Sequence, residues 1–183
     1  FDPSQFRISK SGPSASRATY MAQLLTERLT GKPTEMFSNA HMEWGTEQEP
    51  FARAAYSAKT GELVSEVGFI DHPTIANAGA SPDGVIGEGL VEYKAPATHS
   101  HVEYIFNGKP PQKYLYQMQF QMSVTGAKFC DFCSFDPRLP EKYQLFIVRI
   151  PRDDKLISEI ETEVRAFLEE LDQKIAKLET INL

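Results

Sequence analysis

The sequence predicts an α/β fold in which a mixed β-sheet is flanked by α-helices. Two segments with helical spacing open the chain, and a run of short apolar segments separated by turn residues follows. A helix, two apolar strands and a long helix close it. Elements in that order favour one sheet covered by helical layers. The length of 183 residues suits a single domain over residues 1–183.

The first half of the chain divides at its glycines and prolines. Its predicted elements are a loop at 1–16, a helix at 19–29, a short helix or turn at 37–43, a helix at 44–59, and strands at 63–70, 75–80, 83–86 and 90–95. In the second helix we expect Trp44 and Phe51 near the apolar face, Pro50 as a first-turn residue or a kink, and Gly61 at the end.

The second half has clearer periodicity. Its predicted elements are a short helix at 101–107, a long helix at 112–125, strands at 129–135 and 143–150, and a closing helix at 153–178. The closing helix carries apolar residues at spacings of three and four, which predicts one buried face. Gln117, Gln119 and Gln121 are interleaved with the apolar residues of the long helix.

The charge balance excludes one class of function. A formal net charge of −6 is unlike a protein that coats nucleic acid nonspecifically. A local basic face would still suffice for phosphate contacts. No apolar run approaches the roughly 20 residues that span a bilayer, and nothing resembles a signal peptide. We therefore expect a cytoplasmic protein without a membrane partner. Because the chain begins at Phe1 rather than Met, we expect a fragment of something longer.

The two cysteines, Cys130 and Cys133, form a lone CxxC. A metal site usually needs four ligands, and no second Cys or His pair stands at ligand spacing. Their odd offset places the two side chains on opposite faces of a strand. We expect buried, reduced thiols, which suit the cytoplasm.

The stretch from Asp83 to Lys94 carries the candidate chemistry. Glu92 and Lys94 stand two residues apart in an apolar strand, so their side chains share one face while Tyr93 points to the other. Three intervening glycines predict a hairpin that returns this strand beside Asp83. Two carboxylates and an ammonium would then converge, and a divalent cation usually neutralises carboxylates held that close. The stretch predicts a metal-dependent site that cleaves phosphodiesters.

Pro82-Asp83 with Glu92-x-Lys94 fits the PD-(D/E)xK nuclease pattern, which is short and degenerate. An acidic residue on an upstream helix usually completes such a site. Glu49 is well placed for that part, with Glu47 as the rival ligand. A Gln-rich helix usually follows the ExK strand, and the predicted helix that contains Gln117 matches this pattern.

Further motifs appear in a fixed order around this pattern. They are Trp44-Gly45-Thr46-Glu47-Gln48-Glu49, Ser81-Pro82-Asp83-Gly84, Glu92-Tyr93-Lys94-Ala95-Pro96, Gln117-Met118-Gln119 and Phe135-Asp136-Pro137-Arg138. Over residues 16–178 the chain thereby resembles the lambda-exonuclease/YqaJ viral recombinase family. The resemblance implies a restriction-endonuclease-like fold and a 5′-to-3′ double-strand DNA exonuclease. Such an enzyme resects one strand processively, as a homotrimeric ring around the DNA end, and leaves a 3′ overhang for a single-strand-annealing protein.

The resemblance also implies the metal chemistry. Asp83, Glu92, Glu49 and the backbone carbonyl of Tyr93 would bind one or two Mg²⁺ ions, with Mn²⁺ as a substitute. Two metals would clamp the attacking and leaving oxygens. Lys94 would hold or deprotonate the attacking water, with its pKa lowered beside the metals.

Supporting and DNA-binding residues are implied in the same way. Gln117 would orient the water or a phosphate oxygen, and Asp71 would support the site from behind. DNA contacts are expected from Met42, as an apolar wedge at the terminal base pair, and from Thr98, Lys109, Lys113 and Gln119. We expect His72, His99 and His101 in loops.

Several of these side chains also have an ordinary structural interpretation. Glu49 can be a carboxylate favoured by a helix N-terminus, Gln117 a satisfied core amide and Met42 plain core packing. Lys109 and Lys113 can be solvated surface residues.

The family grips the 5′-phosphate with an Arg and a Thr-Ala-Ser-type motif near its N-terminus. Ser14-Ala15-Ser16 is similar, but it stands closer to Trp44 than the family spacing allows. We therefore expect the phosphate pocket upstream of Phe1.

Two other functions compete with the exonuclease. One is an endonuclease of the same fold, of which the Cas4-like version needs four cysteines where this chain has two. The other is a catalytically idle module that binds DNA ends or recruits a recombinase. The intact Asp83, Glu92 and Lys94 argue against idleness.

Overall fold

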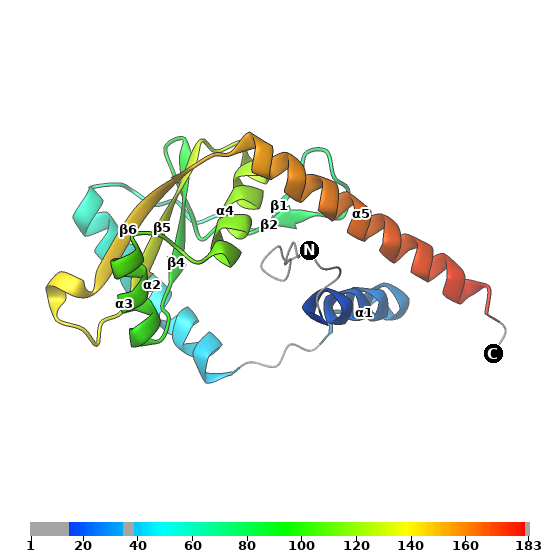
Figure 1. The fold of residues 1–183 in the computed structure, drawn as a ribbon, viewed down its shortest axis with the longest axis horizontal. Coiled ribbons are helices and arrows are strands. Elements are labelled where there is room, and N and C mark those ends of the chain that lie inside the picture. The colour runs from blue at the N-terminus through cyan, green and yellow to red at the C-terminus, as the bar shows by residue number, and fades with distance from the viewer. Residues whose placement is uncertain (1–14, 35–38, 182–183) are drawn as a thin grey trace.

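The computed structural model describes residues 15–34 and 39–181, so residues 1–14 of the predicted loop at 1–16 and part of the segment 37–43 lie outside it, while residues 15 and 16 are helical. Figure 1 shows the arrangement of the elements. These are α1 (Ala15–Thr30), α2 (Ala40–Thr60), β1 (Ile70–Asp71), β2 (Gly79–Ala80), β3 (Gly84–Ile86), β4 (Gly89–Lys94), α3 (Thr98–Asn107), α4 (Gln112–Thr125), β5 (Phe129–Phe135), the 3-10 helix η2 (Glu141–Tyr143), β6 (Leu145–Pro151) and α5 (Asp154–Glu179).

The main sheet has the strand order β3-β4-β5-β6. The central pair β4–β5 is parallel, whereas β3–β4 and β5–β6 are antiparallel. A mixed sheet flanked by helices is therefore confirmed. Strands β1 and β2 form a separate two-stranded sheet.

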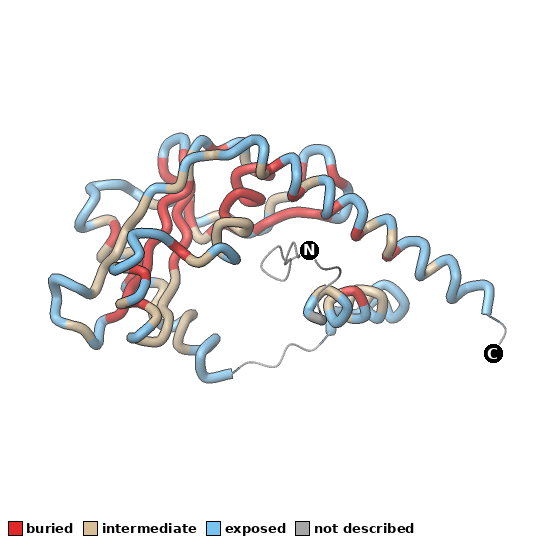
Figure 2. The backbone as a smooth tube through the Cα atoms, viewed as in Figure 1, coloured by how far each residue is buried: buried red, intermediate tan, exposed pale blue. Residues whose placement is uncertain are grey.

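Helices cover both faces of the main sheet, so the central strands are buried (Figure 2). On one face, Tyr56 of α2 packs in a cluster with Val91 and Tyr93. On the other, Met118 of α4 packs in a cluster with Leu90. Side chains that alternate along β4 thus enter two different cores, as the pleat of a strand requires.

The closing helix α5 joins two packing units. Its buried residues follow the predicted spacings of three and four and are Ile157, Ile160, Val164, Phe167 and Leu171. The first part of α5 packs against α4 and the two-stranded sheet, and the later part packs against α1. Tyr20 of α1 stacks on Phe167 with ring centroids 5.8 Å apart. Helix α1 therefore lies along α5, away from the main sheet (Figure 1).

Two predicted strands are wrong. Of residues 63–70, Ser65 forms an isolated bridge with Val85 and Ile70 enters β1, while Leu63 is 88% exposed. Of residues 75–80, the strand covers Gly79–Ala80, and Asn77 adopts a left-handed φ of 60° in the preceding turn. Alternating apolar residues form a strand only where a partner strand lies beside them, and most of these two segments has none.

Helix α2 begins before the predicted start, with Asn39 as its N-cap, and ends as predicted at Gly61, whose φ is 76°. Its buried residues are Ala52 and Tyr56, whereas Phe51 is 61% exposed. The predicted apolar face was wrong because burial follows the sheet against which α2 packs. Pro50 lies inside the helix rather than in its first turn.

The remaining elements agree with their predictions to within a few residues. Cys130 and Cys133 are free, buried and in different clusters on opposite faces of β5, as expected. Burial raises the pKa of both thiols. In the part of the chain that the structure describes, no helix has the length and apolar character needed to cross a membrane.

Candidate active site

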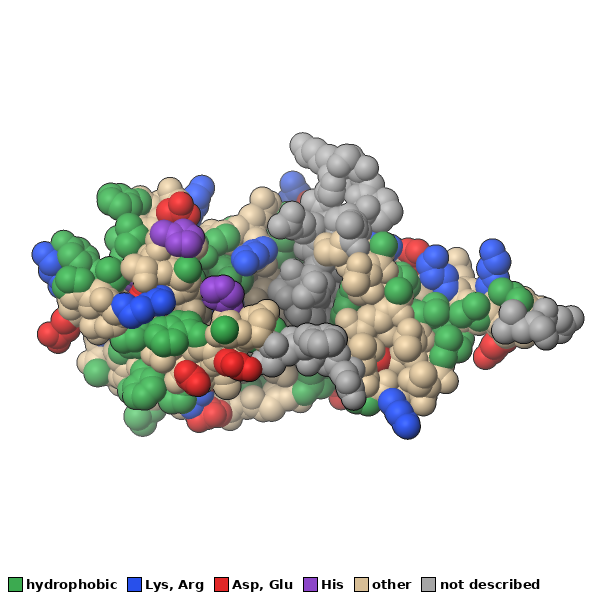
Figure 3. Space-filling view, turned by 90° about the horizontal axis from the view of Figure 1, so that it is seen from below, with side chains coloured by type: hydrophobic (Ala, Val, Ile, Leu, Met, Phe, Trp, Pro, Cys, Tyr) green, Lys and Arg blue, Asp and Glu red, His purple; other side chains and the backbone are tan. Residues whose placement is uncertain are grey.

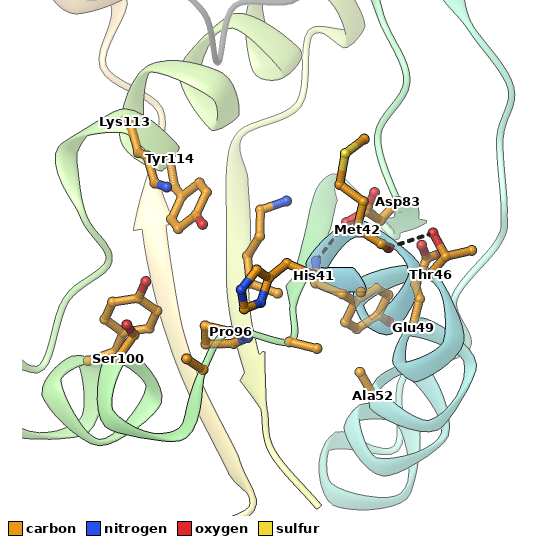
Figure 4. Close-up of a pocket in the computed structure, with 16 residues that line it drawn as sticks. His41, Met42, Thr46, Glu49, Ala52, Asp83, Pro96, Ser100, Lys113 and Tyr114 are labelled. Atoms are coloured by element: carbon orange, nitrogen blue, oxygen red, sulfur yellow. Dashed lines mark hydrogen bonds between the residues drawn. The ribbon is translucent and has the colours of Figure 1, made fainter. Parts of the chain in front are cut away.

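A cavity of about 540 Å³ opens at the C-terminal end of β4, between α2 on one side and α3 and α4 on the other (Figure 4). Its floor is formed around the β3–β4 hairpin. The lining residues are Asp83, Tyr93, Lys94, Ala95, Pro96 and Ala97, with His41, Met42, Gly45, Thr46, Glu49 and Ala52 of α2, Ser100 and Tyr104 of α3, and Lys113 and Tyr114 of α4.

The hairpin brings Asp83 beside β4, as predicted. Asp83 Oδ2 accepts a hydrogen bond of 2.7 Å from the backbone N–H of Tyr93. Burial and the nearby Glu92 carboxylate raise the pKa of Asp83 to about 7, although Lys94 and the Tyr93 N–H act in the opposite direction. The two carboxylates are therefore close enough to repel each other, which is the condition that a bound cation relieves.

Glu92 is fully buried, and three donors surround its carboxylate. Lys94 Nζ contacts Oε1, Gln117 Nε2 donates to Oε1 at 2.6 Å, and Gln121 Nε2 donates to Oε2 at 2.8 Å. A buried carboxylate is tolerated when it is paired and hydrogen-bonded in this way. Gln121 was missed as a site residue. Its position four residues after Gln117, on the same helix face, could have indicated it.

Lys94 lines the cavity and contacts Glu92, so the predicted shared face of these two residues is confirmed. The predicted lowering of its pKa assumed bound metal ions and stays a prediction. Burial lowers the pKa of Lys94, but the carboxylates of Glu92 and Asp83 outweigh that effect and raise it above its usual value. Lys94 is thus an ammonium that donates hydrogen bonds, with Nζ 5.2 Å from the ring centroid of Tyr114.

The structure brings Glu49, rather than its rival Glu47, into the cavity. Glu49 Oε1 accepts a hydrogen bond of 2.9 Å from Arg53, one turn further along α2. Arg53 also contacts the exposed Glu66. Arg53 therefore holds Glu49 at the cavity wall. A metal cation bound in the cavity would replace Arg53 as the partner of Glu49.

Among the described residues, no three His, Cys, Asp or Glu side chains are grouped closely enough to hold a metal by themselves. The donor set nevertheless suits Mg²⁺, because this hard cation takes oxygen ligands, is often held by one or two carboxylates and keeps several waters. Asp83 and Glu49 line the cavity, and the buried Glu92, which is outside the lining, supplies a further carboxylate near Asp83. The position of the Asp83 carboxylate next to β4, near the buried Glu92, favours a cation here.

The other residues predicted to contact DNA divide into two groups. Met42, 45% exposed, and Lys113 line the cavity, with Lys113 Nζ 4.6 Å from the ring centroid of Tyr114. Lys109 is exposed outside the lining, and Thr98 hydrogen-bonds the side chain of Asp136.

The prediction that Gln119 contacts DNA is wrong. Gln119 is 3% exposed, donates to the carbonyl of Pro151 at 2.8 Å and accepts from the N–H of Asp153 at 2.9 Å. Both ends of its amide are therefore satisfied inside the protein. It points away from Gln117 because residues two apart lie on different faces of a helix.

Three further predictions need correction. Asp71 is exposed in β1 and is not among the cavity residues, so it does not support the site from behind. His99 lies in α3 rather than in a loop. His72 lies outside helix and strand as expected, although it is buried, with Nε2 2.9 Å from Ser123 Oγ. His101 is buried in α3, with Nδ1 2.7 Å from Ser134 Oγ. Buried polar partners, invisible in the local sequence, hold both rings in the core.

Comparison with known proteins identifies the family. The model of the YqaJ-like viral recombinase domain matches residues 7–128. The chain belongs to the YqaJ-like viral recombinase family. This match includes Ser14-Ala15-Ser16, of which Ser14 lies outside the described residues. The comparison with curated proteins gives no match.

Solved structures agree with this membership in the YqaJ-like family. A structure of LHK-Exo in complex with dAMP is 57% identical, with a TM-score of 0.87, and the match covers 90% of this chain and 84% of that one. A structure of an alkaline exonuclease (LHK-Exo) from Laribacter hongkongensis is 53% identical, with a TM-score of 0.88 and coverages of 96% and 87%. A phage-related exonuclease from Haemophilus somnus 129PT, 16% identical with a TM-score of 0.71 and coverages of 97% and 92%, shows the fold alone.

Proposed function

We propose that this chain, a nuclease of the YqaJ-like family, is a Mg²⁺-dependent 5′-to-3′ exonuclease that resects one strand of duplex DNA processively and leaves a 3′ overhang. One observation carries the proposal: Asp83 and Lys94 line an open cavity, and Lys94 contacts the carboxylate of the buried Glu92. The identity of 53–57% to the alkaline exonuclease LHK-Exo supports the substrate and the reaction.

The carboxylates of Asp83 and Glu92 and the backbone carbonyl of Tyr93 would hold the cation, with Glu49 completing the set. Mg²⁺ would supply charge stabilisation of the phosphoryl oxygens and a more acidic water. The protein fixes the orientation of these ligands beforehand. The Tyr93 N–H holds Asp83, and the two amides of Gln117 and Gln121 hold Glu92.

Lys94 acts at the edge of this ligand set. Its raised pKa makes it a charged donor, so it can orient the attacking water and stabilise the negative charge that develops on the phosphate. Gln117 donates to Glu92 Oε1, which Lys94 also contacts, so the Gln117 amide can help to orient the water.

The DNA would enter from the open side of the cavity. Lys113 would contact a phosphate and Met42 would contact the terminal base pair, a proposal supported by the position of both side chains in the cavity lining. On the face shown in Figure 3, basic side chains are interspersed with acidic ones, in keeping with the net charge of −6. We therefore expect phosphate contacts to be few and local.

A homotrimeric ring would explain processivity, because a closed ring cannot leave the DNA between successive cuts. The overhang would serve a single-strand-annealing protein. Both assignments extend the family membership to this chain as proposals.

The function is tested on linear and closed circular duplex DNA incubated with Mg²⁺. We expect loss of the linear duplex, survival of the circle, and no activity after addition of EDTA. Cutting of the circle would replace the exonuclease by an endonuclease. Binding of linear DNA without any cleavage would identify an idle end-binding module.

A further inference from the structure

The turn Phe135-Asp136-Pro137-Arg138 and Trp44 have no part in the proposed chemistry, yet they meet beside the cavity. Arg138 Nε donates to Asp136 Oδ1 at 2.7 Å, and Arg138 Nη2 donates to Asp136 Oδ2 at 3.0 Å. The same Nη2 donates to the carbonyl of Pro96 at 3.0 Å. The guanidinium carbon lies 4.7 Å from the ring centroid of Trp44. One side chain thus joins the ends of β5 and β4 to the first turns of α2.

The base of this contact is rigid. The Asp136 side chain is fully buried, and its backbone N–H donates to the carbonyl of Gln144 at 2.9 Å. Gln144 Nε2 in turn donates to the carbonyls of Pro137 at 3.1 Å and Leu139 at 2.8 Å. A two-pronged hydrogen bond to a buried carboxylate orients the guanidinium, so Arg138 presents a fixed plane to Trp44.

Among the residues that the structure describes, the first turns of α2 contribute no fully buried side chain. The buried residues of α2, Ala52 and Tyr56, both follow Pro50. Pro50 has no N–H to donate to the carbonyl of Thr46, so the helix lacks one hydrogen bond where its anchored part begins. The buried indole N–H of Trp44 makes no hydrogen bond with any residue that the structure describes. The contact between Arg138 and Trp44 is therefore important for positioning this part of α2.

That part of α2 carries Met42 and Glu49 into the cavity, facing Asp83 (Figure 4). We propose that Asp136 and Arg138 are positioning residues, which hold the first turns of α2 through Trp44 and thereby set Glu49 and Met42 against the catalytic floor. This inference rests on the proposed function, because it takes Glu49 as a cation ligand and Met42 as a DNA contact.

Trp44 is the single tryptophan of the sequence, so its fluorescence reports the contact directly. In Arg138→Ala we expect a red-shifted emission and at least a twofold increase in acrylamide quenching. Arg149→Ala is the matched control. The Arg149 guanidinium donates two hydrogen bonds to the Asp131 carboxylate, at 2.8 and 2.9 Å, as Arg138 does to Asp136. Its guanidinium carbon lies 3.6 Å from the ring centroid of Phe129, and Arg149 is outside the cavity lining. It should leave the emission of Trp44 unchanged. Unchanged emission and quenching in Arg138→Ala would overturn the proposal.

Kinetics separate positioning from simple stability. For Arg138→Ala we expect kcat on linear duplex to fall about tenfold or more per folded molecule, with a smaller change in KM, because a small misplacement of a catalytic group is costly. The kcat of Arg138→Lys should fall similarly, because an ammonium cannot donate two parallel hydrogen bonds to the carboxylate. Arg149→Ala should keep kcat even where it lowers the melting temperature.

A double-mutant cycle closes the test. If Arg138 acts through Trp44, the variant combining Arg138→Ala with Trp44→Ala loses no more kcat than Trp44→Ala alone. Additive losses of kcat in the double variant, or a wild-type kcat in Arg138→Lys, would contradict the proposal that Arg138 acts through Trp44. If the wild-type protein has no nuclease activity, the proposed function fails by itself. The positioning role of Arg138 is then still tested by the emission of Trp44 and by a titration with Mn²⁺ alone. Weaker Mn²⁺ binding in Arg138→Ala supports it, and equal binding overturns it.

Discussion

At the scale of single residues, the site depends on how one buried carboxylate is kept charged. Glu92 has no exposed surface, and its oxygens accept from Lys94, Gln117 and Gln121. Each donor offsets part of the cost of taking the charge out of water. The same contacts fix the orientation of the carboxylate, so stabilisation and preorganisation have one physical origin.

Lys94→Ala tests the role of the ammonium. We expect duplex binding to persist and cleavage to fall on the order of 10²- to 10⁴-fold, because charge stabilisation at the phosphate is lost. Single-turnover cleavage and a mobility-shift assay measure the two effects. Lys128→Ala, at an exposed ion pair with Glu88, is the control and should keep both properties. Near-normal turnover in Lys94→Ala would remove this residue from the mechanism.

Gln121→Leu tests the amide that the sequence interpretation missed. Removal of a donor to a buried carboxylate should cost roughly 1–3 kcal/mol of unfolding free energy and reduce cleavage about tenfold or more. Gln119→Leu, on the same helix with partners at Pro151 and Asp153, should lose similar stability and keep its turnover per folded molecule. Equal turnover in the two variants would place Gln121 among purely structural residues.

Asp136 predicts a pH dependence of stability. Its burial raises its pKa, but hydrogen bonds from Arg138 and Thr98 outweigh that effect and lower it. A lowered folded pKa gives stability that is present above the unfolded value of about 4 and is lost as pH falls through the folded pKa. The stability difference between wild type and Asp136→Asn should therefore be largest near neutral pH and shrink toward pH 3. Denaturant unfolding across this range measures it.

At the scale of elements, the β3–β4 hairpin decides where Asp83 lies. Gly87, in its turn, has a φ of 52°, and a Cβ there would meet no atom within 4 Å. Gly87→Ala should therefore destabilise the protein by about 1–2 kcal/mol through backbone strain alone. Gly68→Ala, equally unobstructed but without a left-handed φ, should change the melting temperature little. Equal effects in thermal unfolding would show that the turn conformation is not limiting.

Helix α2 shows how an element can serve two purposes. After Pro50 it packs Ala52 and Tyr56 into the core, and before Pro50 it supplies the wall of the cavity. The missing hydrogen bond at Pro50 separates a part held by burial from a part held by Trp44 and Arg138. Local spacing alone could not show this division.

At the scale of the whole molecule, the proposed ring is open to a direct measurement. Light scattering coupled to size exclusion should give about three times the 20.6 kDa chain mass. Processivity follows if a competitor duplex added after the start does not slow degradation of the first. A monomer that remains processive would separate processivity from ring assembly.

The chemistry-bearing hairpin, the long helices α4 and α5 and the opposed cysteines were determined by the sequence itself. In each, the direction of a side chain follows from the period of its own element, two for strands and 3.6 for helices. Asp83, Glu92 and Lys94 could therefore be brought together from local spacing and one turn.

Only the tertiary structure decided which neighbours those side chains meet. It brought Glu49 rather than Glu47 into the cavity, turned Gln121 to Glu92 and Gln119 to Pro151, buried His72 and His101, and set around Lys94 the carboxylates that raise its pKa. The physical reason is common to all. Burial, hydrogen-bond partners and local charge come from segments far apart in the chain, and no local period encodes them.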